Sequence, residues 1–173
     1  MKKVGIVTFH RAKNYGAVLQ GYALQKTVQS LGNECEIIDY KCENIDNSYK
    51  PFQFSKSDPV KSLAKSVIMF RKRAKRIKSF SGFYNNYLKL SKKSYTDREM
   101  VNCKTEYDIF ISGSDQVWGP GKEGVNPDSA YFLDFADGPQ KYSYAASFGV
   151  SDVSDEKIPV LKSLMKGFQA FSV

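Results

Sequence analysis

The hydrophobic positions near the start of the chain predict a strand, a helix and a second strand. Residues 4–9 form a short apolar run of the kind that a parallel sheet buries on both faces. Apolar residues then recur at spacings of three and four over 15–31, which predicts a helix capped by Asn14 and stopped at Gly32. A second strand follows over 34–40. Together these elements predict a β-α-β unit, whose crossover is right-handed by strong preference.

The pattern along the rest of the chain continues the alternation of strands and helices. Residues 41–59 show no periodicity, whereas apolar spacing predicts helices over 60–80 and 83–90. A T-x-x-E capping box beginning at Thr96 predicts another short helix. The remaining predictions are strands over 107–111, 131–135 and 142–147, a helix from 155 or 159 to 166, and an extended segment over 170–173. This order predicts an α/β fold with a mostly parallel, Rossmann-like sheet flanked by helices, as one domain in which 41–106 is a helical, basic insertion or crossover.

The composition excludes several classes of protein. The chain has 173 residues, of which 42% are hydrophobic and 25% charged, as in globular proteins with a buried core. No apolar run approaches the roughly 18 residues of a membrane-spanning helix, and the amino terminus lacks a signal-peptide cleavage site. Cys35, Cys42 and Cys103 are odd in number and show no C-x-x-C spacing, so we expect a cytoplasmic protein without a disulfide framework. With one histidine in the chain, zinc has few candidate ligands, and we expect no metal site. We also expect no bound cofactor.

The net charge of +8 is concentrated in one segment of the chain. Residues 56–93 hold 12 of the 26 Lys and Arg residues and one acidic residue, a net charge of +11. The other residues carry 14 basic and 17 acidic side chains, a net charge of −3. The basic helix over 60–80 has three possible roles: a packed helix with a solvated face, peripheral contact with an anionic membrane, or nucleic-acid binding. Few aromatic residues lie between the basic ones, so nucleic-acid binding is the least favoured of the three roles.

Three segments rich in small and polar residues are candidates for a ligand site, because open α/β sheets bind ligands outside the carboxyl ends of their strands. The first segment, residues 14–20, begins a helix whose free backbone N–H groups suit an anion. Its candidate residues are Asn14, Gly16 and Gln20. In the alternative interpretation, Asn14 only caps the helix and Gly16 only packs.

The second segment, residues 112–118, follows a predicted buried strand. Ser114, Asp115 and Gln116 bring a hydroxyl, a carboxylate and an amide together, and the carboxylate is a candidate general base for a hydroxyl substrate. Trp118 either offers a flat ring to a sugar or belongs to the core. Asp and Ser after strands are equally common in turns and helix caps.

The third segment, residues 143–149, contains Ser147 and Gly149 among small residues that give a strand little packing. Such a segment indicates close approach of a ligand or backbone, or close packing of a helix. His10, at the end of the first strand, is either a general acid or only a surface or loop residue. Each of these segments therefore has a functional and a purely structural interpretation.

Together, these segments resemble the polysaccharide pyruvyl transferase family. The residues that carry the resemblance are 5–10, 14–20, 107–118, 131–135 and 143–149. Their order and separations make it specific over nearly the whole chain outside residues 41–95. The resemblance implies a transferase with two Rossmann-like domains of the GT-B kind. Members move a pyruvyl group from phosphoenolpyruvate to a sugar hydroxyl, usually as a ketal.

The resemblance also implies which part of such an enzyme this chain is. It would be the amino-terminal, acceptor-side half, without the family's second domain, and it is not expected to be active alone. Its partners would be phosphoenolpyruvate, as co-substrate, and a glycan acceptor. The acceptor would belong to a cell-surface polysaccharide or its precursor, and a lipid-linked acceptor is one form that it could take. The residues implied to line the cleft are Asn14, Gly16, Gln20, Ser114, Asp115, Gln116, Ser147 and Gly149, with Asp115 orienting or deprotonating the acceptor hydroxyl. The alternative is a non-catalytic Rossmann-like module that binds a nucleotide or an anionic metabolite.

Overall fold

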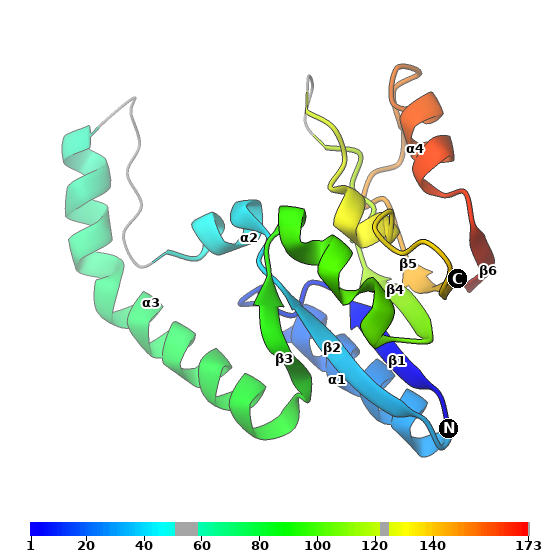
Figure 1. The fold of residues 1–173 in the computed structure, drawn as a ribbon. Helices are drawn as coiled ribbons and strands as arrows, with labels where there is room; N and C mark the ends of the chain where they lie inside the picture. Colours follow the sequence, from blue (N-terminus) through cyan, green and yellow to red (C-terminus); the bar gives the residue numbers. More distant parts are fainter. Residues whose placement is uncertain (51–58, 122–124, 173) are drawn as a thin grey trace.

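The computed structural model describes residues 1–50, 59–121 and 125–172, and these form an α/β fold around one parallel sheet (Figure 1). The six strands of the described sheet are β1 (Lys3–Val7), β2 (Glu34–Tyr40), β3 (Leu90–Tyr95), β4 (Ile109–Asp115), β5 (Gln140–Ala146) and β6 (Phe168–Ser172). They are ordered β3-β2-β1-β4-β5-β6, as in Rossmann folds, and every neighbouring pair is parallel. The predicted fold class is confirmed, with a sheet that is wholly parallel.

The helices cover both faces of the sheet. They are α1 (Tyr15–Ser30), α2 (Glu43–Ser48), α3 (Pro59–Tyr87) and α4 (Ile158–Leu164), with 3-10 helices η1 (Asp97–Glu106) and η2 (Ser129–Phe132). On one face Val4 and Ile6 of β1 share a core with Phe80 of α3, while Val7 packs with Phe110 on the other face. Alternate residues of a strand point to opposite faces, so the short apolar run in β1 serves both cores.

The first β-α-β unit confirms the local signals in the sequence. The side chain of Asn14 accepts a hydrogen bond from the Gly16 N–H at 2.8 Å, and α1 begins at the next residue, Tyr15. Gly32 follows the helix with a φ of 81°, a left-handed conformation that suits glycine. Gly21 of α1 lies close to Thr8, because a Cβ at Gly21 would be 3.3 Å from Thr8 Cγ2. This packing brings the start of α1 to the carboxyl end of β1.

The region between β2 and β4 departs from the prediction. The two helices predicted over 60–80 and 83–90 are one continuous helix, α3. Residues 41–106, expected to be helical, also contain β3, which pairs with β2 at the edge of the sheet. β3 has the sequence LSKKSY and exposes Lys92 and Lys93. The apolar pattern of a buried strand is missing there because an edge strand tolerates charged side chains.

Two further segments differ from the prediction. The strand predicted over 131–135 is wrong: η2 ends at Phe132, and Leu133 takes a left-handed φ of 56°. Asp128 caps this 3-10 helix by accepting a hydrogen bond from Ala130 N–H, so an apolar run packs in the core as a turn. Part of the segment 41–59, expected to be irregular, forms α2, and residues 51–58 lie outside the described part of the chain. The capping box at Thr96 is confirmed at the start of η1.

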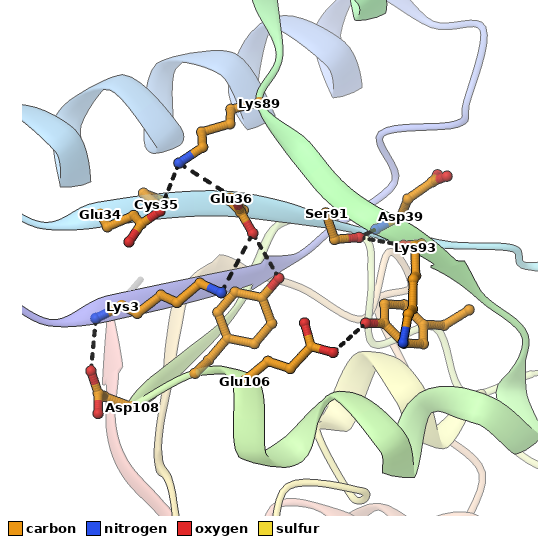
Figure 2. A network of polar contacts seen from close by, with 12 residues as sticks. Lys3, Glu34, Cys35, Glu36, Asp39, Lys89, Ser91, Lys93, Glu106 and Asp108 are labelled. Carbon is orange, nitrogen blue, oxygen red and sulfur yellow. Dashed lines mark hydrogen bonds and ion pairs between the residues drawn. The ribbon is translucent and has the colours of Figure 1, made fainter.

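A polar network joins the amino-terminal halves of the strands (Figure 2). Glu36 of β2 is buried, and its carboxylate accepts a hydrogen bond from Tyr107 Oη at 3.1 Å. Lys89 Nζ lies 3.4 Å from the same carboxylate and 2.9 Å from that of Glu34. The backbone N–H of Lys3 donates to Asp108 at 2.8 Å. These contacts lie toward the amino-terminal ends of the strands, whereas the predicted ligand site lies at their carboxyl ends. Their role is therefore to hold the strands together.

Candidate functional site

The carboxyl ends of β1 and β4 lie side by side at the centre of the sheet. Val7, the last residue of β1, pairs with Ser112 of β4. From β1 the chain continues to β2 on one side, whereas β4 is followed by β5 on the other. In open α/β sheets, ligands bind at this point of reversal. The first and second predicted site segments both reach it.

A hydrogen bond joins the first segment to the second. Ser114 Oγ lies 3.2 Å from Gln20 Oε1, and the hydroxyl donates to this amide oxygen. Thr8 Oγ1 donates to the carbonyl oxygen of Ser114 at 3.2 Å. Ser114 and Thr8 are buried, whereas Gln20 is exposed. The amide of Gln20 is therefore held at the surface of this edge by groups underneath it.

The third segment lies beside the second. The Ser147 N–H donates to the Asp115 carbonyl oxygen at 3.0 Å, and the Trp118 N–H donates to the Ser147 carbonyl at 3.1 Å. Gly149 has a φ of 70°, and a Cβ there would lie 2.7 Å from Gln116 Oε1. The structure thus brings Gln20, Ser114, Asp115, Gln116, Ser147 and Gly149 to one edge of the sheet.

Asp115 is the carboxylate at the centre of this group. Its Oδ1 accepts a hydrogen bond from the Gln116 N–H at 2.8 Å, and the residue is partly exposed. Its φ of 91° is uncommon for a residue with a side chain, and such conformations cluster at functional sites. Gly113, two residues earlier, has a φ of 120°, and a Cβ there would lie 2.1 Å from the Tyr144 carbonyl oxygen. Close contact with β5 therefore requires glycine next to the site.

Two predicted residues have structural contacts that match the alternative interpretations. Asn14 is the cap of α1, and its side chain is bonded to Gly16 N–H. Trp118 is 4% exposed, its ring stacks on Phe132, and its Nε1–H donates to the Tyr131 carbonyl at 3.1 Å. The interpretation of Trp118 as a platform for a sugar ring is corrected, because neighbouring aromatic rings cover its faces.

His10 is buried, with 2% of its surface exposed. Its Nδ1 lies 3.2 Å from the Thr8 carbonyl oxygen, and its Nε2 lies 2.9 Å from Asp39 Oδ1. Each ring nitrogen already has a polar partner within the protein. The ring therefore joins the ends of β1 and β2. This placement removes His10 as a candidate general acid, because a substrate cannot reach either nitrogen.

Asp39, at the end of β2, is a residue that the sequence interpretation missed. Burial opposes its ionisation, but hydrogen bonds from His10, Arg11 and Ser94 outweigh burial and hold its pKa well below the ordinary value. The signal that could have revealed it is its position, since an acidic residue at the end of the second strand is frequent at Rossmann ligand sites. Here its carboxylate is committed to these three side chains.

A cavity of about 1070 Å³ lies beyond the ends of β2 and β3 and contains none of the predicted site residues. Its lining includes the cations Lys41, Lys50 and Arg98 and several carboxylates and amides. Asp128 lies in this lining and accepts a hydrogen bond from Tyr40 Oη at 2.9 Å. Burial raises the pKa of Asp128 in spite of that bond. The mixed charge suits a hydroxylated ligand better than a multiply charged anion, which a predominantly cationic site would bind.

The family of the chain follows from one comparison. The family model for polysaccharide pyruvyl transferase matches residues 14–173. This chain belongs to the polysaccharide pyruvyl transferase family. The resemblance carried by the sequence is therefore confirmed, and the matched range contains every predicted site residue from Asn14 to Gly149. Neither a curated protein nor a solved structure matches the chain.

Membership of the polysaccharide pyruvyl transferase family gives the polar group around Asp115 a chemical context. The group contains a carboxylate, two amides and two hydroxyls, from Asp115, Gln20, Gln116, Ser114 and Ser147. Carboxylates and amides of this kind bind hydroxyl groups through directional hydrogen bonds. Across the described residues, no helix of this family member has both the length and the apolar character needed to cross a bilayer.

Proposed function

We propose that this polysaccharide pyruvyl transferase moves a pyruvyl group from phosphoenolpyruvate to a sugar hydroxyl of a cell-surface polysaccharide or its precursor. The observation that carries the proposal is the convergence of Gln20, Ser114, Asp115 and Gln116 at the reversal point of the sheet. This position is where Rossmann-like folds bind ligands. We place the reaction in the cytoplasm, because the three cysteines are buried free thiols.

Asp115 is the proposed base for the acceptor. Its carboxylate takes the proton of the attacking sugar hydroxyl, whose oxygen then bonds to C2 of the pyruvyl group. Formation of a ketal requires two hydroxyl oxygens to bond to that carbon and phosphate to leave. Of the two hydroxyl protons, one is added to the methylene carbon of phosphoenolpyruvate and the other leaves with the phosphate. General base catalysis of this kind contributes about 10²–10⁴-fold to a rate.

The other residues of the site bind and orient. The amides of Gln20 and Gln116 are placed to hold neighbouring hydroxyls of the acceptor, and the buried hydroxyl of Ser114 orients the Gln20 amide. Ser147 and Gly149 form the adjoining wall, where the absence of a side chain at Gly149 leaves room for Gln116. The backbone N–H groups at the start of α1, next to Asn14 and Gly16, are the proposed position for an anionic group of phosphoenolpyruvate.

The proposal divides the site between two substrates, and a binding experiment tests the donor part. Phosphoenolpyruvate is titrated calorimetrically into the folded 173-residue chain. Heat of binding that persists in Asp115→Asn and is lost with Gly16→Pro supports a donor position at the start of α1. A folded chain that binds no phosphoenolpyruvate contradicts a donor position in this chain and leaves it the acceptor-side role.

Turnover tests the role of Asp115. Because this chain is not expected to be active alone, release of phosphate from phosphoenolpyruvate is measured with the family's second domain present and a polysaccharide acceptor, for the wild type and for Asp115→Asn. The expected loss is about 100-fold or more, because the amide cannot take a proton. Asp152→Asn is the matched control, since Asp152 is exposed outside the site. An Asp115→Asn variant within a few-fold of wild type would exclude this residue as the base.

A further inference from the structure

α1 and the carboxyl-terminal half of α3 together form an exposed face of unusual composition, which we call the aromatic–basic face. Its exposed apolar residues are Tyr15 and Leu19 of α1 and Tyr87 of α3, with 72%, 52% and 56% of their surfaces accessible. On α3, Lys72, Arg76, Ser79, Phe83 and Tyr87 follow one another at spacings of four, three, four and four. These spacings place the five residues on one side of the helix.

Contacts between rings join the two helices of the aromatic–basic face. Tyr15 lies 4.9 Å from Phe80, and Tyr22 lies 5.9 Å from Phe83, measured between ring centroids. Between the helices is an apolar cavity of about 160 Å³, lined by Tyr15, Val18, Leu19, Ser79, Phe80 and Phe83. The face therefore contains connected apolar surface with a hollow in it. Such a patch on a soluble domain marks an interaction site.

Cations surround these rings. Arg76 lies over the ring of Phe80 at 5.8 Å, Lys26 lies over Tyr22 at 5.6 Å, and Lys13 lies over Tyr84 at 5.0 Å. Arg76 also donates a hydrogen bond to the carbonyl oxygen of Lys13, which joins α3 to the loop before α1. The sequence contains no acidic residue between positions 59 and 93. The partner of this face must therefore be both apolar and anionic.

From this combination we infer that the aromatic–basic face binds the surface of a bilayer containing anionic lipids. Tyrosine and phenylalanine are favoured at the boundary between headgroups and acyl chains, and lysine and arginine bind anionic headgroups. A second copy of the chain is a poor occupant, because two such faces would repel each other. Nucleic acid matches the charge but offers no apolar phase for Leu19 and the cavity.

The acceptor part of the candidate site points away from the aromatic–basic face, whereas the proposed donor position at the start of α1 borders this face at Tyr15. Gln20 follows Tyr15 by five residues, so the two side chains are about 140° apart around α1. The membrane inference therefore stands apart from the proposed role of Asp115. Loss of turnover in a site variant would leave vesicle binding unchanged, and loss of vesicle binding would leave the chemistry of Asp115 untouched.

Sedimentation with vesicles tests the inference. The 173-residue chain is centrifuged at low salt with two kinds of phosphatidylcholine vesicle. One kind contains about 30 mol% phosphatidylserine, an anionic lipid, and the other contains none. Binding is expected only with phosphatidylserine and is expected to weaken as salt rises. The double variant Lys26→Gln/Lys72→Gln, at two exposed lysines of the face, should lower the partition coefficient by about 25-fold, since each basic residue near the surface contributes about fivefold.

Matched controls separate this face from net charge and from general apolar exposure. Lys162→Gln/Lys166→Gln removes two exposed charges in and just after α4, which lies at the opposite end of the sheet from α3 (Figure 1). Tyr15→Ser/Leu19→Ser should weaken binding at unchanged net charge, while Val101→Ser/Val150→Ser, at exposed positions elsewhere, should not. Circular dichroism melting verifies that each variant is folded.

Three results would overturn the inference. The first is no sedimentation with anionic vesicles at low salt. The second is equal loss of binding in the control pairs and in the pairs on the face. The third is binding of a single-stranded oligonucleotide by the wild type with no binding to vesicles, which would assign the face to nucleic acid instead.

Discussion

Arg11 and Asp39 form a two-pronged ion pair at the carboxyl edge of the sheet. Arg11 Nε donates to Asp39 Oδ1 at 2.8 Å, and its Nη2 donates to Oδ2 at 2.9 Å. The pair joins the loop after β1 to the end of β2, next to the buried ring of His10. The planar guanidinium matches both carboxylate oxygens at once, which makes this geometry specific to arginine.

Replacement of Asp39 by asparagine is expected to destabilise the fold by about 2–3 kcal/mol at neutral pH. This is less than the 3–5 kcal/mol typical for one partner of a fully buried pair, because 26% of the Arg11 side chain is exposed. The pKa of Asp39 is held below its ordinary value, so its stabilisation is complete above about pH 4 and is lost as the pH falls further.

Thermal melting of the wild type and Asp39→Asn between neutral pH and pH 2 measures this effect. The difference in Tm should be largest at neutral pH and should shrink below about pH 4. Asp137→Asn, at an exposed carboxylate before β5, is the control and should melt like the wild type. A difference in Tm that stays constant down to pH 2 would show that Asp39 acts without its charge.

Gly113→Ala is expected to be much more destabilising than Gly138→Ala. Both glycines have positive φ, at 120° and 97°, so both variants carry the conformational penalty of about 1–2 kcal/mol. Only at Gly113 would the added Cβ meet a backbone oxygen, at 2.1 Å, whereas nothing lies within 4 Å at Gly138. Urea unfolding of the two variants should differ by more than the penalty itself, and equal losses would contradict the observed contact between β4 and β5.

Fluorescence of Trp118, the single tryptophan, should report a buried ring. Its emission should be blue-shifted and resistant to acrylamide, because Phe132, Phe148 and Phe168 surround it. Adding a glycan should leave the emission unchanged, and Trp118→Ala should cost about 3–5 kcal/mol of stability. An emission change that saturates with glycan, in a chain that stays folded, would restore the sugar-binding interpretation.

The three cysteines should be unreactive in the folded chain. Burial raises the pKa of Cys35 and of Cys103 to about 12, and it also raises the pKa of Cys42. At pH 8 each thiol therefore stays protonated, and the thiolate that attacks a disulfide reagent is scarce. Ellman's reagent should detect no thiol before denaturation and all three afterwards, whereas one thiol reacting in the native state would indicate local opening around it.

Local signals were sufficient to predict the first β-α-β unit. Asn14 and Gly32 mark the ends of α1, and the bounds predicted for the second strand, 34–40, are those of β2. A cap and a stop act through hydrogen bonds and backbone angles within a few residues, so the sequence contains them in full. The family resemblance rested on the same kind of local segments and is confirmed by the match over 14–173.

Other elements depended on distant partners. β3 has no apolar alternation because it forms the polar edge of the sheet, and only its pairing with β2 makes it a strand. Residues 131–135 are apolar for the opposite reason: they fill the core as a turn, capped by Asp128. In both cases burial against the rest of the molecule, which periodicity alone does not contain, decided the conformation.

The sequence by itself determined the alternation of strands and helices, the Rossmann-like class, and which polar residues follow the buried strands. Only the tertiary structure decided which of them meet. The Ser114 hydroxyl donates a hydrogen bond to Gln20, the Ser147 N–H donates to the Asp115 carbonyl oxygen, and the buried ring of His10 contacts Asp39. The physical reason is one of range. Helix caps and strand patterns act between neighbours in the chain, whereas these contacts join residues tens of positions apart and exist only once the strands have paired.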